Sequence, residues 1–243
     1  MKKIFVAIPS WTGYPHPEVI FSLWNQELPE WYKLIFNESS IISRQIVHRA
    51  RNELVRRFLD WWYDYLLRCD DDNPPTFDWL KRLIESDKDI VSGVVPLRWW
   101  HAYNITIEWN GLKSLKWLDD VFEIENFWTW FCLLKRDVVK KVFEATWGYP
   151  YMFSPWEFVW NNKNWLELYN KQDKKKWYEN DYVCKDWWIY IRKWEIGEDL
   201  YFWLKAKELW YKMYANKYAI CKHLRWSDDF ITISDIEWRN SQS

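Results

Sequence analysis

Apolar runs alternate with amphipathic segments along the first 96 residues. Residues 3–9 are almost continuously apolar, which is typical of a strand that is buried on both faces. Helical periodicity is clearest over residues 43–59, where one apolar stripe contains Ile46, Val47, Ala50, Leu54, Val55 and Phe58. Further strands are expected at residues 32–36, 63–69 and 89–94, and further helices at residues 17–26 and 76–86. This alternation predicts an α/β fold with a mostly parallel central sheet flanked by helices.

The second half of the chain is less regular. We expect strands at residues 104–108, 121–125, 129–135, 213–216 and 219–224, and helices at residues 136–146 and 197–209. Residues 147–194 are aromatic, polar and lysine-rich, and we interpret them as a long excursion. No linker separates two independent units. The sequence therefore predicts one domain over residues 1–243, with abutting halves at 1–96 and 97–226 and a polar tail at 227–243.

The strand expected at residues 63–69 leads into an acidic tip. Asp70, Asp71 and Asp72 follow it, and Pro74 and Pro75 prevent the strand from continuing. In an open α/β sheet, ligands bind beyond the carboxyl ends of the strands. Asp70 and Asp72 can hold a hard divalent cation, which in turn can hold a diphosphate. The alternative is a solvated turn in which an aspartate caps the next helix, and this stretch alone does not separate the two.

Charge and cysteine content exclude several classes of protein. The net charge of −1 gives no general electrostatic reason to expect a nucleic acid partner. The four cysteines are widely spaced, and we expect buried free thiols in a reducing cytoplasm.

The first apolar run ends at Pro9 without a cleavage site, and no apolar stretch reaches the roughly 18 residues that span a bilayer. We expect a cytoplasmic protein without a transmembrane segment, and leave open peripheral attachment at the inner membrane face.

The chain contains 24 Trp but only 5 Gly, whereas glycine normally makes up about 7% of residues. Several tryptophans stand where a chain usually needs glycine: Trp61 and Trp62 lie between a helix and a strand, and Trp210 lies where a helix should end in a left-handed cap. We hypothesise that many of these codons, with UGA the candidate, are read as glycine in the source cell. The alternative is a genuinely tryptophan-rich protein that stacks indoles on sugars. Under the first hypothesis some positions, such as Trp79 within a good helical pattern, can still be genuine tryptophans.

Several common site motifs are missing from the sequence. There is no GxGxxG after the first strand and no GxxxxGK[ST], so neither a dinucleotide site of the Rossmann kind nor a P-loop is supported. Prolines replace the glycine that an EF-hand loop needs after its first carboxylates. The sequence also lacks the GxSxG elbow of serine hydrolases and the HExxH motif of zinc proteases.

An ordered set of short segments does form a recognisable pattern. Those segments are Ala7-Ile8-Pro9-Ser10, Arg49-Ala50-Arg51-Asn52, Leu67-Arg68-Cys69-Asp70-Asp71-Asp72, Asp89-Ile90-Val91-Ser92-Gly93, Asn126-Phe127-Trp128-Thr129-Trp130-Phe131, Glu198-Asp199-Leu200-Tyr201-Phe202 and Cys221-Lys222-His223. In this order and spacing they resemble the GT-A glycosyltransferases, especially the family-2-like enzymes that use nucleotide sugars. The resemblance covers about residues 3–96 and 124–225, and it implies a GT-A-like fold. In such enzymes the stretch at residues 128–131 normally carries glycines.

For the nucleotide sugar, the resemblance implies a binding site at the ends of the first strands. Pro9 and Ser10 would lie beside the base, and Arg51 near the base or the diphosphate. Asp70 would approach the ribose or the metal, and Asp71 would belong to the same nucleotide-sugar site.

For the reaction, the resemblance implies a metal site and a base. Asp72, with Asp70 and His223, would ligate the metal that bridges the diphosphate oxygens. Asp199 would be the catalytic base, and Glu198 would orient the acceptor. Mixed oxygen and imidazole ligands suit Mn²⁺, with Mg²⁺ close behind. A divalent ion neutralises the departing diphosphate, and a carboxylate must take the proton of the attacking hydroxyl.

The sequence thus predicts a metal-dependent glycosyltransferase that moves a sugar from a nucleotide-diphosphate donor to a hydroxyl acceptor, with inversion. A glycan, a lipid-linked sugar or a protein could provide that hydroxyl. The first alternative is a sugar nucleotidyltransferase, which is disfavoured because the first loop lacks a Gly-rich segment that bears arginine. The second alternative is a non-catalytic carbohydrate-binding protein with exposed tryptophan platforms.

Overall fold

The structure is a computed structural model, and it describes most of the chain outside residues 151–181. The described residues are 1–10, 13–45, 47–97, 103–107, 110–111, 114–127, 131–146, 148, 150, 182–185, 188–191, 194–196, 198–226 and 229–234. Within these ranges, the side chains of residues 110–111, 182–200 and 225–229 lie outside the description.

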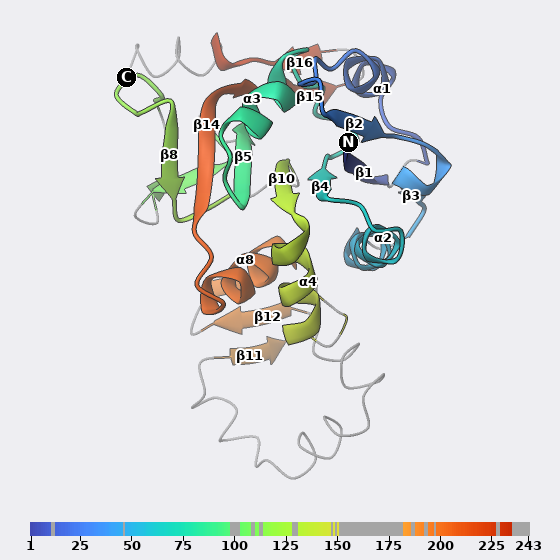
Figure 1. Ribbon diagram of the computed structural model, residues 1–243. Helices are drawn as coiled ribbons and strands as arrows, with labels where there is room; N and C mark the ends of the chain where they lie inside the picture. Colours follow the sequence, from blue (N-terminus) through green and yellow to red (C-terminus); the bar gives the residue numbers. More distant parts are fainter. Residues whose placement is uncertain are drawn as a thin grey trace, which may run out of the picture.

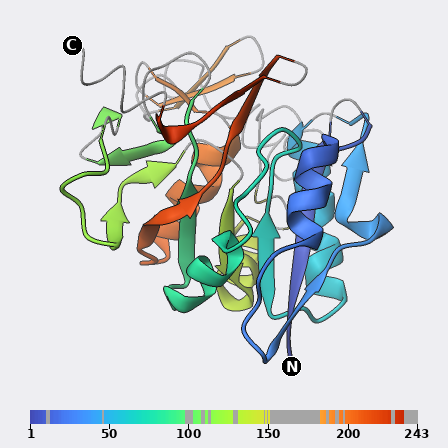
Figure 2. The same cartoon turned by 90° about the horizontal axis from the view of Figure 1, so that it is seen from above.

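A central sheet organises the described part of the chain, with strand order β2-β1-β4-β10-β5-β14-β8 and with β3 paired to the end of β1. These strands are β1 (Lys2–Ser10), β2 (Tyr32–Ile35), β3 (Ile41–Ser43), β4 (Tyr65–Arg68), β5 (Ile90–Val94), β8 (Val121–Ile124), β10 (Cys132–Lys135) and β14 (Met213–Ile220). The strands β2, β3 and β4 all run parallel to β1, and β5 runs parallel to β14. Figure 2 shows β1 and β4 running together away from the N-terminus.

Helices cover both faces of this sheet (Figure 1). One face carries α1 (Pro17–Trp24) and α3 (Trp79–Glu85), and the other carries α2 (Val47–Asp60), α4 (Arg136–Ala145) and α8 (Glu198–Glu208). Outside the sheet lie the short helix η1 (Glu38–Ser40) and the strands β6 (Ile105–Ile107), β7 (Asn110–Gly111), β9 (Asn126–Phe127), β11 (Tyr182–Lys185), β12 (Trp188–Ile191), β13 (Trp194–Ile196), β15 (His223–Trp226) and β16 (Asp229–Ile231). The predicted α/β fold with a mostly parallel, Rossmann-like sheet of the GT-A kind is confirmed.

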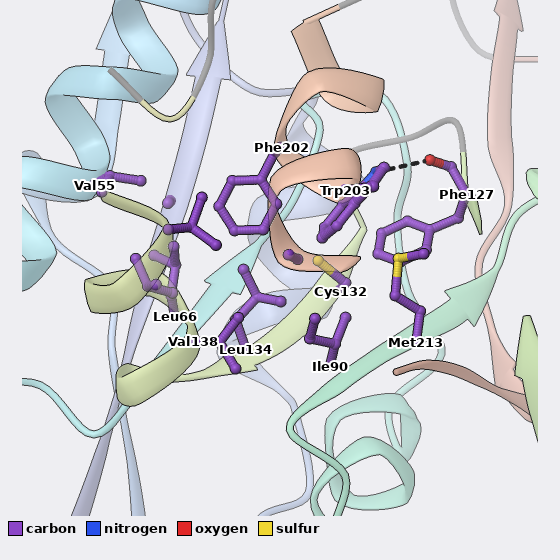
Figure 3. Packing of buried hydrophobic residues seen from close by; sticks show 14 of the residues in the cluster. Val55, Leu66, Ile90, Phe127, Cys132, Leu134, Val138, Phe202, Trp203 and Met213 are labelled. Carbon is purple, nitrogen blue, oxygen red and sulfur yellow. Dashed lines mark hydrogen bonds between the residues drawn. The ribbon is translucent and has the colours of Figure 1, made fainter. Parts of the chain in front are cut away.

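The sheet separates two apolar cores, because successive side chains of a strand point to opposite faces. Phe5 and Ala7 of β1 face the core below α2, α4 and α8, whereas Ile4 and Val6 face the core below α1 and α3. Figure 3 shows the first core, in which Phe202 and Trp203 of α8 pack over β4, β5 and β10. This double burial explains why β1 is apolar at almost every position.

Two helices begin later than the periodicity predicted. Residue 43, where the helix was expected to begin, is instead the last residue of β3, which pairs with β1, and Arg44 then takes a left-handed conformation with a φ of 56°. The helix α3 begins at Trp79 rather than at residue 76, and the segment before it is bonded to β14, where the backbone N–H of Thr76 donates to the Ile220 carbonyl. In both cases the residue where the helix was expected to begin forms a contact distant in sequence.

Strand pairing also differs from the prediction in three places. The strand β10 lies antiparallel between β4 and β5, so these two strands are not neighbours. Strands were expected at 213–216 and 219–224, but the strands in the structure are β14, which extends from Met213 to Ile220, and β15, which begins at His223. β14 continues past Asn216, whose Oδ1 accepts a hydrogen bond from the Tyr218 N–H at 2.9 Å. Residues 229–231 of the expected polar tail form β16 against β15, and Ile231 is buried there.

Two tryptophans adopt the backbone conformation that normally requires glycine. Trp62 follows α2 with a φ of 55°, and Trp210 follows α8 with a φ of 67°. Their side chains are 81% and 93% exposed. After α8, the N–H of Tyr211 donates to the Ala206 carbonyl and that of Trp210 to the Lys207 carbonyl, which is the Schellman arrangement. The predicted left-handed cap is confirmed, and it agrees with the hypothesis that Trp210 stands for a glycine.

The cysteines Cys69, Cys132 and Cys221 are buried free thiols, as predicted, and Cys184 lies outside the described side chains. Burial is the main cause that raises the pKa of Cys69, and the charges of Asp70, Asp72 and Asp71 raise it further. This thiol therefore stays protonated. Among the helices that the structure describes, none is both long and apolar enough to cross a membrane.

Candidate functional site

The acidic tip after β4 is fixed to a segment near the end of the chain. The N–H of Leu224 donates to the Asp72 carbonyl at 2.9 Å, and the N–H of Lys222 donates to the Pro74 carbonyl at 3.1 Å. The side-chain amide of Asn73 donates to the Lys222 carbonyl at 3.3 Å. Because these bonds involve the residues on both sides of His223, the backbone places His223 opposite Asp72.

The side chains of Asp72 and His223 meet at this junction. His223 Nε2 lies 3.7 Å from Asp72 Oδ2, and both side chains are largely buried. The other ring nitrogen, Nδ1, is 2.7 Å from the Pro96 carbonyl oxygen. A carbonyl oxygen only accepts hydrogen bonds, so Nδ1 carries a proton and donates to Pro96, and Nε2 is the ring nitrogen that faces Asp72. The structure thus brings together two of the three residues predicted as metal ligands.

This donor set fits a divalent cation. An imidazole whose far nitrogen donates to a carbonyl is the usual state of a metal-ligating histidine, and a carboxylate oxygen beside it suits Mn²⁺ or Mg²⁺. Among the described residues no group of three or more histidine, cysteine, aspartate or glutamate side chains could hold a metal. Two protein ligands agree with a cation that takes its remaining ligands from a diphosphate and water.

Asp70, the third predicted ligand, pairs with an arginine. Its Oδ1 lies 3.5 Å from Nη2 of Arg51, a buried arginine of α2. Arg51 lies on the buried side of α2, next to Ala50. Because Ala50, Leu54 and Val55 pack on the sheet, the Arg51 side chain lies toward the end of β4. A guanidinium beside the acidic tip offsets part of its negative charge, and it can bind phosphate oxygens.

Asp71 joins the tip to the end of β1. Ser10 Oγ donates to Asp71 Oδ2 at 2.7 Å, and the N–H of His16 donates to the Asp71 carbonyl at 2.9 Å. Burial raises the pKa of Asp71; the bond from Ser10 lowers it, and the charges of Asp72 and Asp70 raise it again. Pro9 is buried in the same strand next to Ser10. The five residues predicted to bind the nucleotide sugar therefore lie at the adjoining ends of β1 and β4 and on α2.

Glu198 and Asp199 occupy the first turn of α8, but their side chains lie outside the described part of the chain. The helix itself is anchored: Trp203 is buried, and its indole N–H donates to the Phe127 carbonyl at 3.0 Å (Figure 3). The guanidinium carbon of Arg68 lies 4.6 Å from the centre of the Trp203 ring. The remaining stretch of the expected acceptor site, residues 128–130, lies outside the described residues.

Sequence reasoning missed residues that support the site without carrying its chemistry. Arg68 is a fully buried charge on β4 below α8. Asn73 is 1% exposed and holds the acidic tip to the strand before His223. The sequence signals for them were weak: Arg68 is a charged residue in an apolar strand, and Asn73 is an asparagine before two prolines. Neither signal has a characteristic spacing.

Comparison with known proteins gives a fold and no family. No family model matches the chain, and no curated protein matches it either. The crystal structure of A197 from STIV is similar over 97% of this chain and 92% of A197, with a TM-score of 0.57 at 17% sequence identity. This similarity supports the fold alone. Two crystal structures of S. aureus TarS match 58% of this chain with a TM-score of 0.36, at 13% and 12% identity, and this chain covers 48% and 29% of them. One of these contains residues 1–349 in complex with UDP.

Proposed function

We propose that the protein is a metal-dependent glycosyltransferase that moves a sugar from a nucleotide-diphosphate donor to a hydroxyl acceptor. The observation that supports this most strongly is the meeting of Asp72 and His223 at 3.7 Å beyond β4. These residues are far apart in sequence, and they meet where an α/β sheet binds ligands. Further support is that the Ser10–Asp71 and Arg51–Asp70 pairs lie next to them at the adjoining ends of β1 and β4 and on α2.

In this proposal, some residues bind the nucleotide-sugar donor and others hold the metal that stabilises the leaving group. Ser10 and Asp71 contact the base, with Pro9 packed beside them, and Arg51 with Asp70 contacts the ribose and diphosphate. Asp72 and His223 hold Mn²⁺ or Mg²⁺, which when bound supplies positive charge against the diphosphate oxygens of the leaving group. Residues 1–96 form the donor half, and residues 97–226 form the acceptor half.

Acceptor activation is assigned to the first turn of α8. Asp199 accepts the proton of the acceptor hydroxyl as that oxygen attacks the anomeric carbon, and Glu198 orients the acceptor. Attack from the side opposite the diphosphate inverts the configuration. The support for this assignment is that α8, whose first turn contains Glu198 and Asp199, is anchored to the sheet next to β4 through Trp203.

The test is hydrolysis of a panel of UDP- and GDP-sugars by the full chain with and without Mn²⁺. We expect metal-dependent release of UDP or GDP, and loss of at least 100-fold in Asp72→Ala, since a buried metal ligand is removed. Asp120→Ala is the matched control, because Asp120 is an exposed aspartate that pairs with Lys217 far from the acidic tip. An Asp72→Ala protein as active as the parent would contradict the proposal.

A further inference from the structure

Asn104 lies beside the site and was not among the residues that sequence reasoning selected. Its side chain is fully buried. Asn104 Oδ1 accepts a hydrogen bond from the Val95 N–H at 2.8 Å, and the backbone N–H of Asn104 donates to the Val95 carbonyl at 2.9 Å. The amide Nδ2 also donates to the Gly93 carbonyl at 3.4 Å. One asparagine therefore fixes the backbone on both sides of Val95, directly after β5.

Pro96 connects this fixed backbone to His223. The Pro96 carbonyl accepts the hydrogen bond from His223 Nδ1 at 2.7 Å. A proline has no backbone N–H that could donate a hydrogen bond, so the position of Pro96 depends on contacts of the neighbouring residues. These are the hydrogen bonds between Val95 and Asn104 and an antiparallel bridge to Tyr103.

We propose that Asn104 is a positioning residue for His223. Its side chain fixes the Val95 N–H and the Gly93 carbonyl, so it holds the end of β5 from which Pro96 follows. The Pro96 carbonyl is thereby kept where it accepts from Nδ1, and Nε2 faces Asp72. Without this carbonyl, the imidazole can rotate and move its proton to Nε2, and a protonated Nε2 cannot bind a metal. The inference rests on the proposed metal site for its function, but its structural part concerns only the histidine ring.

Two measurements test the proposal on the full chain. The first is the tautomer of His223 without metal, read from long-range ¹H–¹⁵N correlations and assigned with His223→Gln. The second is the affinity for Mn²⁺ together with UDP, measured by calorimetry. We expect Asn104→Ala to shift His223 away from the Nδ1–H tautomer and to weaken Mn²⁺ binding by about 10–100-fold, as for other residues that orient metal-ligating histidines.

Further variants separate positioning from folding. Asn104→Asp retains an oxygen that accepts from Val95 and should restore the tautomer and most of the affinity. Asn104→Leu, which keeps the volume but cannot accept, replaces the alanine variant if that does not fold. Asn216→Ala is the matched control: Asn216 is also a buried asparagine, bonded to the Arg82 carbonyl, the Ser86 hydroxyl and the Tyr218 N–H, and lies on the part of β14 that pairs with Val121.

The outcomes are distinct. The proposal is overturned if Asn104→Ala leaves the tautomer unchanged, or if Asn216→Ala alters it equally. If the wild-type protein fails to bind Mn²⁺ with UDP, the proposed function fails, whereas the tautomer measurement still decides the role of Asn104.

Discussion

Replacing Trp210 with glycine is expected to stabilise the protein, although it removes the largest side chain in the genetic code. Trp210 has a φ of 67° and is 93% exposed. A residue with a Cβ loses about 1 kcal/mol or more in the left-handed region, and glycine does not. Because the indole is almost fully exposed, its removal forfeits little buried area.

The expected gain in free energy of unfolding is therefore about 1 kcal/mol, which raises the Tm by about 2–4 °C for a chain of this size. The assay is urea denaturation followed by circular dichroism, with a thermal scan in parallel. Trp210→Ala separates the causes, since alanine removes the indole but keeps the Cβ. We expect the glycine variant to exceed the alanine variant by about 1 kcal/mol.

Trp24 provides the matched control. It is 71% exposed and occupies the last position of α1 with an ordinary helical backbone. Glycine costs up to about 1 kcal/mol in a helix, so Trp24→Gly should destabilise the protein. If Trp210→Gly is no more stable than Trp210→Ala, the argument from backbone conformation is refuted. The coding DNA tests the wider hypothesis, because UGG codons at positions 62 and 210 would exclude recoding.

Three further predictions concern stability and its pH dependence. Arg136→Ala should lower the free energy of unfolding by about 2 kcal/mol in urea titrations, because the guanidinium donates to the carbonyls of Phe58, Leu59 and Tyr63 at the end of α2; an unchanged midpoint would count against this. Burial raises the pKa of Asp71 above its ordinary value of 3.8, so the contribution of this carboxyl to stability is fully present below pH 3.8 and is lost as the pH rises through the folded-state pKa. The stability of Asp71→Asn relative to the wild type should therefore increase as the pH is raised above 3.8 in urea titrations, and a constant difference would contradict the sign. Gly93→Ala should cost about 1–3 kcal/mol, because a Cβ there would lie 2.6 Å from the Ala219 carbonyl oxygen and also meet the Trp79 indole; a thermal scan that matches the wild type would refute it.

Much of the fold could be predicted from the chain because local patterns encode it. Continuous apolar residues identified β1, and the stripe through Ala50, Leu54 and Phe58 identified α2. What local patterns could not indicate was the partner of each strand. Two features depend on contacts between distant residues: β10 lies between β4 and β5, and Ser43 pairs with Ser10 where the helix was expected to begin.

The candidate site divides in the same way. The acidic tip is visible as a strand that ends in aspartates, but spacing alone could not connect Asp72 to His223, and the resemblance to GT-A enzymes supplied that link. The Arg51–Asp70 pair was expected only as two separate residues near the nucleotide. Asn104 gave no signal, because its role depends on a carbonyl that it does not itself contact.

The most direct test of the central claim is the electron spin echo spectrum of Mn²⁺ bound with UDP to the full chain. If Asp72 and His223 hold the cation, the wild-type complex shows coupling to a histidine ¹⁴N, and His223→Gln loses this coupling. A wild-type complex that binds Mn²⁺ and UDP without any nitrogen coupling would contradict the claim.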